Sequence, residues 1–313
     1  MAGDNSAQVA DDALRARKLT RAGLVRVELI PPPASASPFV TTFFRVQCDE
    51  TEIRDVQPSS IGLVAVMARG SGHMHFLDGR VEASHPLMVL TPTSAATTFE
   101  VAGPWDAFGA MLSPAGWAAL TGLSATVHGN RMMAAADVLP PRLVAACERL
   151  REEFGSLENH QMADLLCEAL MPSLRRLPPG HAELIGTVAE WLAQSLSPEL
   201  AELFARCRYG ERQVQRLVER YFGLAPRTLA RKYRALRAAV LLSRPGVTAD
   251  DIAAVQDHFY DQPHMIREMR LFAGRTPARI ADPDTPYLSA FLDLRDFSEG
   301  GSRMAPIPDD LRA

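Results

Sequence analysis

The 313-residue sequence predicts a multi-domain α+β protein, with a sheet-rich N-terminal half followed by an all-α C-terminal domain. Three observations carry this prediction. Segments with the period of strands occupy the chain up to Trp117, helical periodicity replaces them after it, and two helix-turn-helix patterns fill residues 198–280. A chain of this length is sufficient for two domains.

The N-terminal half carries a series of short strand patterns. Residues 40–48 alternate apolar and polar side chains, which is typical of a half-buried strand, and Asp78-Gly79 is a strong signal for a two-residue hairpin turn. Further strands are expected at residues 62–69, 73–77, 80–84, 87–91, 97–101 and 106–112. Several short strands with turns between them indicate a small barrel or sandwich.

Two amphipathic helices follow the strands. Their apolar stripes consist of Leu143, Cys147, Leu150 and Phe154, and of Met162, Leu165, Leu166, Ala169 and Leu170. The pair either packs on the strands or forms a dimer interface, and the pattern leaves both alternatives open. The LPPG segment at residues 177–180 is expected to mark the boundary with the C-terminal domain.

The first helix-turn-helix pattern covers residues 198–223. A first helix at 198–207 and a turn at 208–210 precede a second helix at 211–223, which Gly223 ends. One face of the second helix carries Val214, Leu217, Val218 and Tyr221, and the opposite face carries Arg212, Gln215, Arg216 and Glu219. Because Arg can bind guanine and Gln can bind adenine in a major groove, the polar face is a candidate DNA-reading surface.

The second helix-turn-helix pattern covers residues 249–280. Ile252 and Val255 are assigned to a short first helix, and Asp261 is the expected N-cap of the second. Its inward stripe consists of Met265, Met269 and Phe272, opposite Arg267 and Arg270. Gly274 supplies the C-terminal stop.

The two patterns together resemble the AraC/XylS family of bacterial transcription regulators. The matching phrases are VQRLVERYFGLAPRTLARKYRALRAAVLL, residues 214–242, and FYDQPHMIREMRLFAGRTPARI, residues 259–280. The resemblance implies two DNA-contacting helices per monomer, and by position their contacts fall to Arg212, Gln215, Arg216, Gln262, His264 and Arg267. It also implies a cupin-like barrel as the N-terminal sensor, a homodimer that uses the helix pair, and double-stranded promoter DNA as partner, with RNA polymerase a further candidate.

Geometry and charge agree with DNA binding. A linking helix over residues 226–243 would span roughly 27 Å, close to the roughly 34 Å between successive half-sites on DNA. From Arg206 to Arg237 there are ten Arg and Lys against two Glu, a net charge of +8 in a chain whose total is −4. Arg231 and Lys232, within this block, are expected to contact phosphates.

The turns of both units depart from the family pattern, because Arg208 and His258 stand where glycine is usual. If His258 is left-handed, glycine there avoids a cost of roughly 1–2 kcal/mol, and His258→Gly should stabilise the domain. If it is right-handed, the same change should destabilise it by about 0.5–1 kcal/mol. We expect the left-handed case, since the surrounding spacing is kept.

Other functional classes find little support. His73 and His75 lie on one strand face, but Glu82 is late and His85 falls in a turn, so no metal or other cofactor is expected. No nucleophile elbow or phosphate loop suggests an enzyme. Four cysteines without paired spacing, no long apolar run and no signal-like N-terminus favour a cytoplasmic protein with reduced thiols and no membrane partner.

The expected organisation has four parts. Residues 1–20 form a flexible arm, 21–177 a cupin-like sensor and dimerisation domain with the helix pair, 181–282 the DNA-binding domain, and 283–313 a tail. We expect a sequence-specific regulator controlled by an unknown small-molecule effector or a partner at its N-terminal domain. The alternative is a cupin-like small-molecule binding module or enzyme with a degenerate DNA-binding domain.

Overall fold

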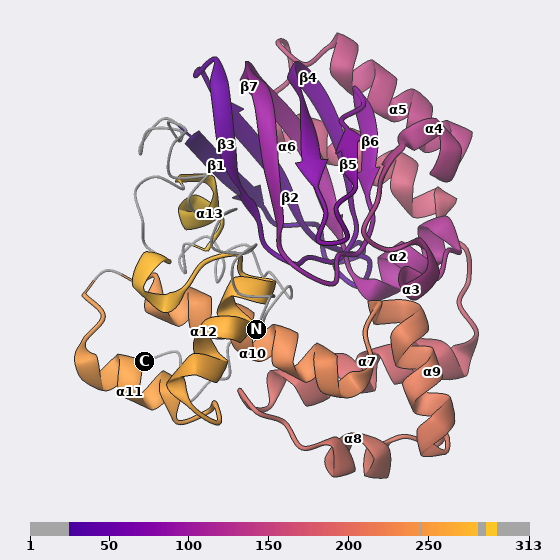
Figure 1. The fold of residues 1–313 in the computed structure, drawn as a ribbon. Helices are drawn as coiled ribbons and strands as arrows, with labels where there is room; N and C mark the ends of the chain where they lie inside the picture. Colours follow the sequence, from indigo (N-terminus) through magenta and orange to yellow (C-terminus); the bar gives the residue numbers. More distant parts are fainter. Residues whose placement is uncertain (1–24, 245, 281–285, 293–313) are drawn as a thin grey trace.

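The computed structural model describes residues 25–244, 246–280 and 286–292, and Figure 1 shows their arrangement. A sheet forms the upper part of the molecule, helices flank one side of it, and the C-terminal helices lie below. The arm expected at residues 1–20 lies outside the described residues, as does the expected tail apart from residues 286–292.

The N-terminal domain is built on one eight-stranded antiparallel sheet. Its strands are β1 Val25–Ile30, β2 Val40–Cys48, β3 Glu52–Gln57, β4 Leu63–His75, β5 Val81–Ala83, β6 Leu87–Leu90, β7 Thr97–Leu112 and β8 Met132–Ala134. The order is β1-β2-β7-β4-β6-β8, with β3 paired to β7 and β5 to β4. The expected sheet-rich region is confirmed, but the described strands include no pairing of β1 with β8, so the sheet is open and not a closed barrel.

Several strand boundaries differ from the sequence prediction. Segments 62–69 and 73–77 belong to the single strand β4, and 97–101 and 106–112 to the single strand β7. Gly70 has φ +92° at an irregularity between Arg69 and Ser71, so this glycine forms a bulge and the strand continues beyond it. The sequence patterns miss β1, β3 and β8. The hairpin is confirmed, but its loop has three residues, 77–79, and not the two predicted, because the Phe76 amide donates to Arg80 O at 2.8 Å.

The helix pair packs on the sheet. In α5 Pro141–Glu152 and α6 Asn159–Leu170, the apolar stripes are buried in a cluster with Phe43 of β2 and Phe108 of β7. Consequently β2 is buried on both faces, and the expectation of a half-buried strand is wrong because the helices cover its outer face. Short helices complete this domain: α2 Pro114–Thr121, α3 Ala125–His128, α4 Ala135–Val138 and η1 Met171–Ser173.

The C-terminal half is helical, as predicted. It consists of α7 Pro179–Ala193, α8 Leu200–Arg206, α9 Glu211–Phe222, α10 Pro226–Leu242, α11 Ala249–Gln256, α12 Gln262–Phe272, η2 Pro277–Arg279 and α13 Pro286–Phe291. The pairs α8–α9 and α11–α12 are the two predicted units, and α10 is the linking helix between them. Ile252 and Val255 both lie on α11, as predicted, and of the two Val255 is buried whereas Ile252 is 40% exposed.

The C-terminal helices are docked on the rim of the sheet. At the end of α12, Phe272 O accepts from the Ser59 amide and Leu271 O accepts from the Ala96 amide, both at 2.8 Å. Gly274 follows with φ +80°, and a Cβ placed there would lie 2.2 Å from Cγ1 of Val56. A close backbone approach that needs glycine therefore holds the second unit against β3.

Candidate nucleic-acid interface

The α9 helix presents one polar face to the surface. Its opposite face is buried through Val214, Leu217, Val218, Tyr221 and Phe222. Gly223 ends the helix in the left-handed conformation with φ 81°. This burial leaves the three predicted reading residues, Arg212, Gln215 and Arg216, exposed together along α9. The predicted exposure of these three side chains is confirmed, and their contact with DNA stays a prediction.

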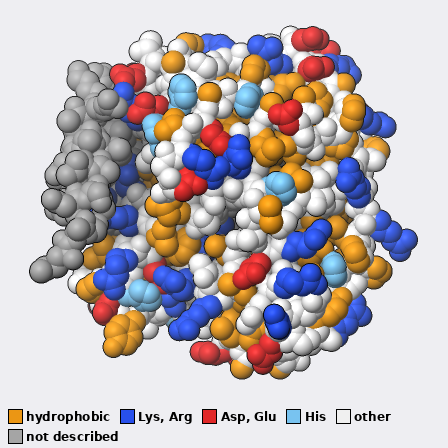
Figure 2. Space-filling view, turned by 45° about the vertical axis from the view of Figure 1, so that its right-hand side comes forward, with side chains coloured by type: hydrophobic (Ala, Val, Ile, Leu, Met, Phe, Trp, Pro, Cys, Tyr) orange, Lys and Arg blue, Asp and Glu red, His pale blue; other side chains and the backbone are white. Residues whose placement is uncertain are grey.

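Local hydrogen bonds fix the direction of one of these side chains. Nη2 of Arg216 donates to Oε1 of Gln213 at 2.9 Å, one turn earlier on α9. A partly ordered guanidinium loses less conformational entropy when it binds. Figure 2 shows one face of the molecule, and in its lower part several Lys and Arg side chains lie at the surface with a few acidic side chains between them.

The α12 helix begins as the sequence predicts. Oδ1 of Asp261 accepts from the His264 amide at 2.6 Å, and Pro263 stands in the first turn, where a missing N–H costs little. Met265, Met269 and Phe272 form the buried face. Gln262 and Arg267 are exposed, so the structure places them on the accessible side of the second unit.

His264 has a different environment from these two residues. Its ring is partly buried, and Nε2 lies 2.9 Å from Oε1 of Glu268 on the same helix. Glu268 itself is 1% exposed and also accepts from Arg231 at 2.5 Å and from Arg234 at 2.7 Å. His264 was predicted to contact a base and Arg231 a phosphate. In the structure both side chains instead bind Glu268. Sequence spacing gave no sign of this network, because its members come from two helices.

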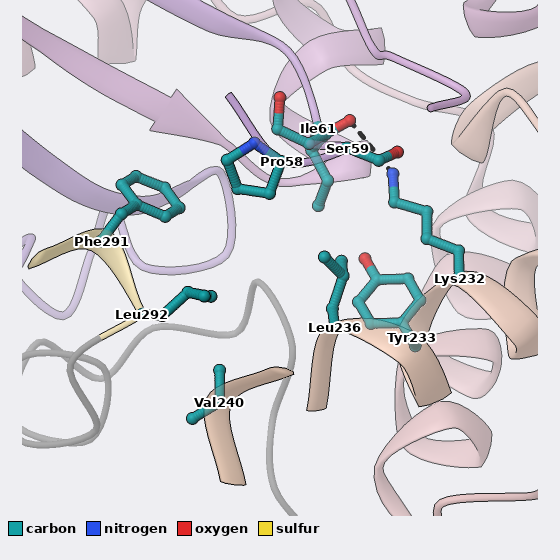
Figure 3. A pocket seen from close by; sticks show the side chains of 10 residues that line it. Pro58, Ser59, Ile61, Lys232, Tyr233, Leu236, Val240, Phe291 and Leu292 are labelled. Atoms are coloured by element: carbon teal, nitrogen blue, oxygen red, sulfur yellow. Dashed lines mark hydrogen bonds between the residues drawn. The ribbon is translucent and has the colours of Figure 1, made fainter. Parts of the chain in front are cut away.

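Lys232 lies inside the protein, and its predicted phosphate contact does not fit this position. The side chain is 2% exposed, and Nζ donates to Ser60 O at 3.2 Å and to Thr93 O at 3.3 Å. Figure 3 shows it reaching from α10 toward the segment at Ser59 and Ile61. Burial lowers the pKa of Lys232 to about 7. This residue therefore joins the linking helix to the N-terminal domain.

The net charge of +8 over residues 206–237 is larger than the positive charge at the surface, because some of the basic side chains are buried or paired. Arg237 is also buried, and its guanidinium donates to Ser195 O at 2.9 Å and to Leu192 O. Burial lowers its pKa to about 10. Arg206 pairs with Glu190 and Arg208 with Glu183. The charge that faces solvent is concentrated on α9 and at the start of α10, where Arg227 is exposed.

The two turns do not use the left-handed conformation. In the described part of the chain, Asn130 is the single non-glycine residue with positive φ. Arg208 and His258 therefore have negative φ, and the expected left-handed His258 is wrong. The His258 amide bonds to Val255 O at 3.3 Å, and its carbonyl accepts from Ser197 Oγ at 3.3 Å. The turn has rearranged so that it does not need glycine.

The N-terminal domain contacts the first unit directly. Oγ1 of Thr126 on α3 donates to Glu219 O on α9, and Gly223 packs beside Ala125. The contact lies at the C-terminal end of α9, away from Arg212 at its start. The N-terminal domain thus touches both helix-turn-helix units without covering the exposed polar residues of α9.

A pocket lies within the N-terminal sheet. Its walls are mainly apolar side chains of β2, β4, β6 and β7, and its volume is about 80 Å³. His73 is exposed on β4 and is part of the wall, and His75 is partly buried. Over the described residues, no three His, Cys, Asp or Glu side chains form a metal-binding group. None of the described helices is long and apolar enough to cross a bilayer.

Comparison with known protein families finds a helix-turn-helix domain in the C-terminal part of the chain. A family model described as "Helix-turn-helix domain" matches residues 203–282. Among solved structures, ToxT from Vibrio cholerae aligns with TM-score 0.40 and 9% identity over 86% of this chain and 97% of that chain. The AraC-like transcriptional activator CuxR aligns with TM-score 0.30 and 11% identity over 74% of this chain and 84% of that chain. No curated protein sequence matches.

The family match coincides with the geometry. Residues 203–282 begin inside α8 and include α9, α10, α11 and α12, which are both units and the helix that links them. The C-terminal part of the chain therefore carries a helix-turn-helix domain over residues 203–282.

Proposed function

We propose that the regulator binds promoter DNA with α9 and α12 as its two recognition helices, placed in successive major grooves. The linking helix α10 has 17 residues, which corresponds to about 25 Å of rise. Helix-turn-helix half-sites on one face of DNA lie roughly 34 Å apart, so one monomer can span two grooves when the helix widths are added.

The observation that carries the proposal is the exposed polar face of α9. Arg212, Gln215 and Arg216 are accessible on a helix whose other face is fully buried. Arg can donate two hydrogen bonds to guanine, and Gln can exchange two with adenine. On α12, Gln262 and Arg267 have the same access. His264 joins them if DNA draws its ring away from Glu268.

Regulation is proposed to act through the contacts between the domains. The sensing domain caps the last turn of α12 through Ser59 and Ala96, and it touches α9 through Thr126. A small molecule or partner that alters the sheet rim would therefore change the relative positions of the recognition helices. We propose such an effector and assign it to the pocket in the sheet.

The proposal also covers the location of the protein, the roles of its domains and its oligomeric state. We propose a cytoplasmic protein that acts by binding rather than catalysis, with residues 21–177 as sensor, 181–282 as DNA-binding domain and RNA polymerase as a further partner. We also propose a homodimer. Since the apolar stripes of α5 and α6 pack on the sheet, a dimer contact on these helices would have to use their outward-facing side chains.

Footprinting of the full chain tests the recognition mode. Bound sites are first mapped across a genome, and one of them is then probed with the purified protein. Protection should cover two successive helical turns for each monomer. Protection of a single turn that Arg267→Ala leaves unchanged would show that α12 does not read DNA.

A further inference from the structure

The C-terminal segment of the chain returns to the sensing domain. Helix α13, which follows the DNA-binding domain in sequence, packs on β1 and β3, and Figure 1 shows it beneath the sheet. Tyr287, Leu288 and Phe291 are all buried there. Residues 286–292 are therefore an integral part of the wall of the N-terminal domain.

Tyr287 enters the pocket of the sheet. Its ring centroid lies 5.1 Å from that of Phe99 in an edge arrangement and 5.7 Å from that of Trp105. Its hydroxyl donates to Oε1 of Gln57 at 2.5 Å. Offset and edge contacts between aromatic rings are the favourable ones, and a buried hydroxyl needs a partner. These three residues thus form a built phenol-binding site, which the chain fills with its own phenol.

The backbone of α13 is anchored beside this site. The Tyr287 amide donates to Oδ2 of Asp55 at 2.9 Å, while Oδ1 of Asp55 accepts from the Val56 amide at 2.7 Å. Asp55 and Gln57 both belong to β3, so one strand holds the tail by its backbone and by its side chain. Burial, with the nearby Asp55 as a smaller cause, raises the pKa of Tyr287, which keeps its hydroxyl protonated as a donor.

The size of the pocket indicates that an organic ligand needs additional room. With Tyr287 in place the pocket holds about 80 Å³. An apolar cavity that accepts benzene measures about 150 Å³. The methionines Met67, Met74, Met88 and Met132 line the pocket and supply adaptable walls. Among the aromatic residues that line the pocket, Tyr287 alone comes from α13 and not from a strand of the sheet, so its departure would empty a space the size of a phenol.

The same helix also reaches the linking helix. Figure 3 shows Phe291 and Leu292 on one side of a second small pocket, with Leu236 and Val240 of α10 opposite. Displacement of α13 would therefore remove a wall next to the helix that sets the spacing of the two recognition helices. This contact gives the tail a route from the sensor pocket to the DNA-binding domain.

We propose that Tyr287 is a built-in occupant of the effector site, and that the effector is a small phenol which binds between Phe99, Trp105 and Gln57 by displacing it. The proposal rests on the proposed function, because it gives the chemical class of the effector of that sensor. The bound phenol donates its hydroxyl hydrogen to Gln57 in place of Tyr287 and stacks against the two aromatic rings.

Calorimetric titration of the full chain with p-cresol, the side chain of tyrosine as a free molecule, tests the proposal. Wild type should bind one p-cresol weakly, because the side chain of Tyr287 competes for the same site. Tyr287→Ala should bind it at least about tenfold more tightly if Tyr287 fills nine-tenths or more of the sites in wild type, because the apparent affinity of wild type is reduced to the fraction of sites that Tyr287 leaves open. Tyr260→Ala removes a tyrosine that is 92% exposed and should match wild type.

A second ligand, toluene, and a second variant, Tyr287→Phe, separate the effect of the hydroxyl from that of the ring. Toluene, which lacks the hydroxyl, should bind Tyr287→Ala about threefold or more weakly than p-cresol does, reflecting the lost hydrogen bond to Gln57. Tyr287→Phe keeps the ring and loses only that bond, so its p-cresol affinity should fall between wild type and Tyr287→Ala. It supplies the comparison if the alanine variant does not fold.

Three outcomes would overturn the proposal: no p-cresol binding to any variant, equal affinity of wild type and Tyr287→Ala, or equal affinity for toluene. DNA binding of the same full-length proteins is measured separately by footprinting. A phenol site without DNA protection would contradict the proposed function alone, and DNA protection without a phenol site would contradict this inference alone.

Discussion

The side chains of Arg234 and Glu268 form an ion pair in which Nη2 lies 2.7 Å from Oε2. This pair joins the linking helix α10 to α12, the second helix of the second unit. Glu268 is 1% exposed, so its carboxylate depends on Arg231, Arg234 and His264 to replace water. The position of the second helix-turn-helix unit is therefore fixed electrostatically as well as by packing.

Removal of this carboxylate should destabilise the C-terminal domain. We expect Glu268→Ala to lower the free energy of unfolding by about 1.5–3 kcal/mol, because it leaves partly buried guanidinium groups without their acceptor. Urea unfolding followed by circular dichroism measures the change. Glu202→Ala removes an exposed carboxylate from α8 and is the matched control. A loss no larger than that of the control would show that the network contributes little.

The exposed arginines of α9 should determine sequence preference. Arg212→Ala and Arg216→Ala should each weaken binding to the specific site by about 1–3 kcal/mol, with a smaller loss on random DNA. Fluorescence anisotropy with both duplexes at one salt concentration measures this difference. Arg149→Ala, on the outer side of α5, is a control for loss of positive charge. Equal losses on specific and random DNA would reassign these residues to phosphate contacts.

Lys232 should affect stability and not DNA affinity. In the folded chain its pKa is about 7, against 10.5 for the unperturbed group, so between these values the unfolded chain binds a proton that the folded chain lacks. Stability of the wild type should thus rise with pH across this window, by up to about 1.4 kcal/mol per pH unit relative to Lys232→Met.

Denaturant unfolding at several pH values measures that difference. Arg227→Met, at an exposed position of the same helix, should leave the pH dependence as in wild type. If Lys232→Met instead weakened binding to all DNA sequences and left the pH dependence unchanged, the lysine would leave its buried position when DNA binds.

Replacement of His258 tests the rearranged turn. Because its φ is negative, glycine gains no conformational advantage in the folded state and adds freedom to the unfolded chain. We expect His258→Gly to destabilise the domain by about 0.5–1 kcal/mol. His258→Ala separates loss of the side chain from added backbone freedom, and should be less destabilising than glycine. Stabilisation by glycine would mean that the turn is left-handed in solution.

Local sequence patterns were enough to predict the elements whose boundaries depend on neighbouring residues. The helices α9, α10 and α12 begin and end close to the predicted positions, because their caps, such as Asp261 and Gly223, act within one turn. Their apolar stripes also identified which side chains would be exposed. Arg212, Gln215 and Arg216 could be chosen on this basis, since one helix carries both the buried and the exposed face.

The contacts that each helix or strand makes with distant parts of the chain depend on the tertiary structure and could not be predicted from local patterns. Lys232 lies in a basic run that resembles a DNA-binding surface, yet its side chain is buried and its ammonium donates to the backbone oxygens of Ser60 and Thr93 in the N-terminal domain. Periodicity could not show that α5 and α6 cover β2, or that Glu268 would collect three cationic or histidine side chains. The return of Tyr287 to Gln57, 230 residues away in sequence, depends on long-range packing that no local pattern encodes.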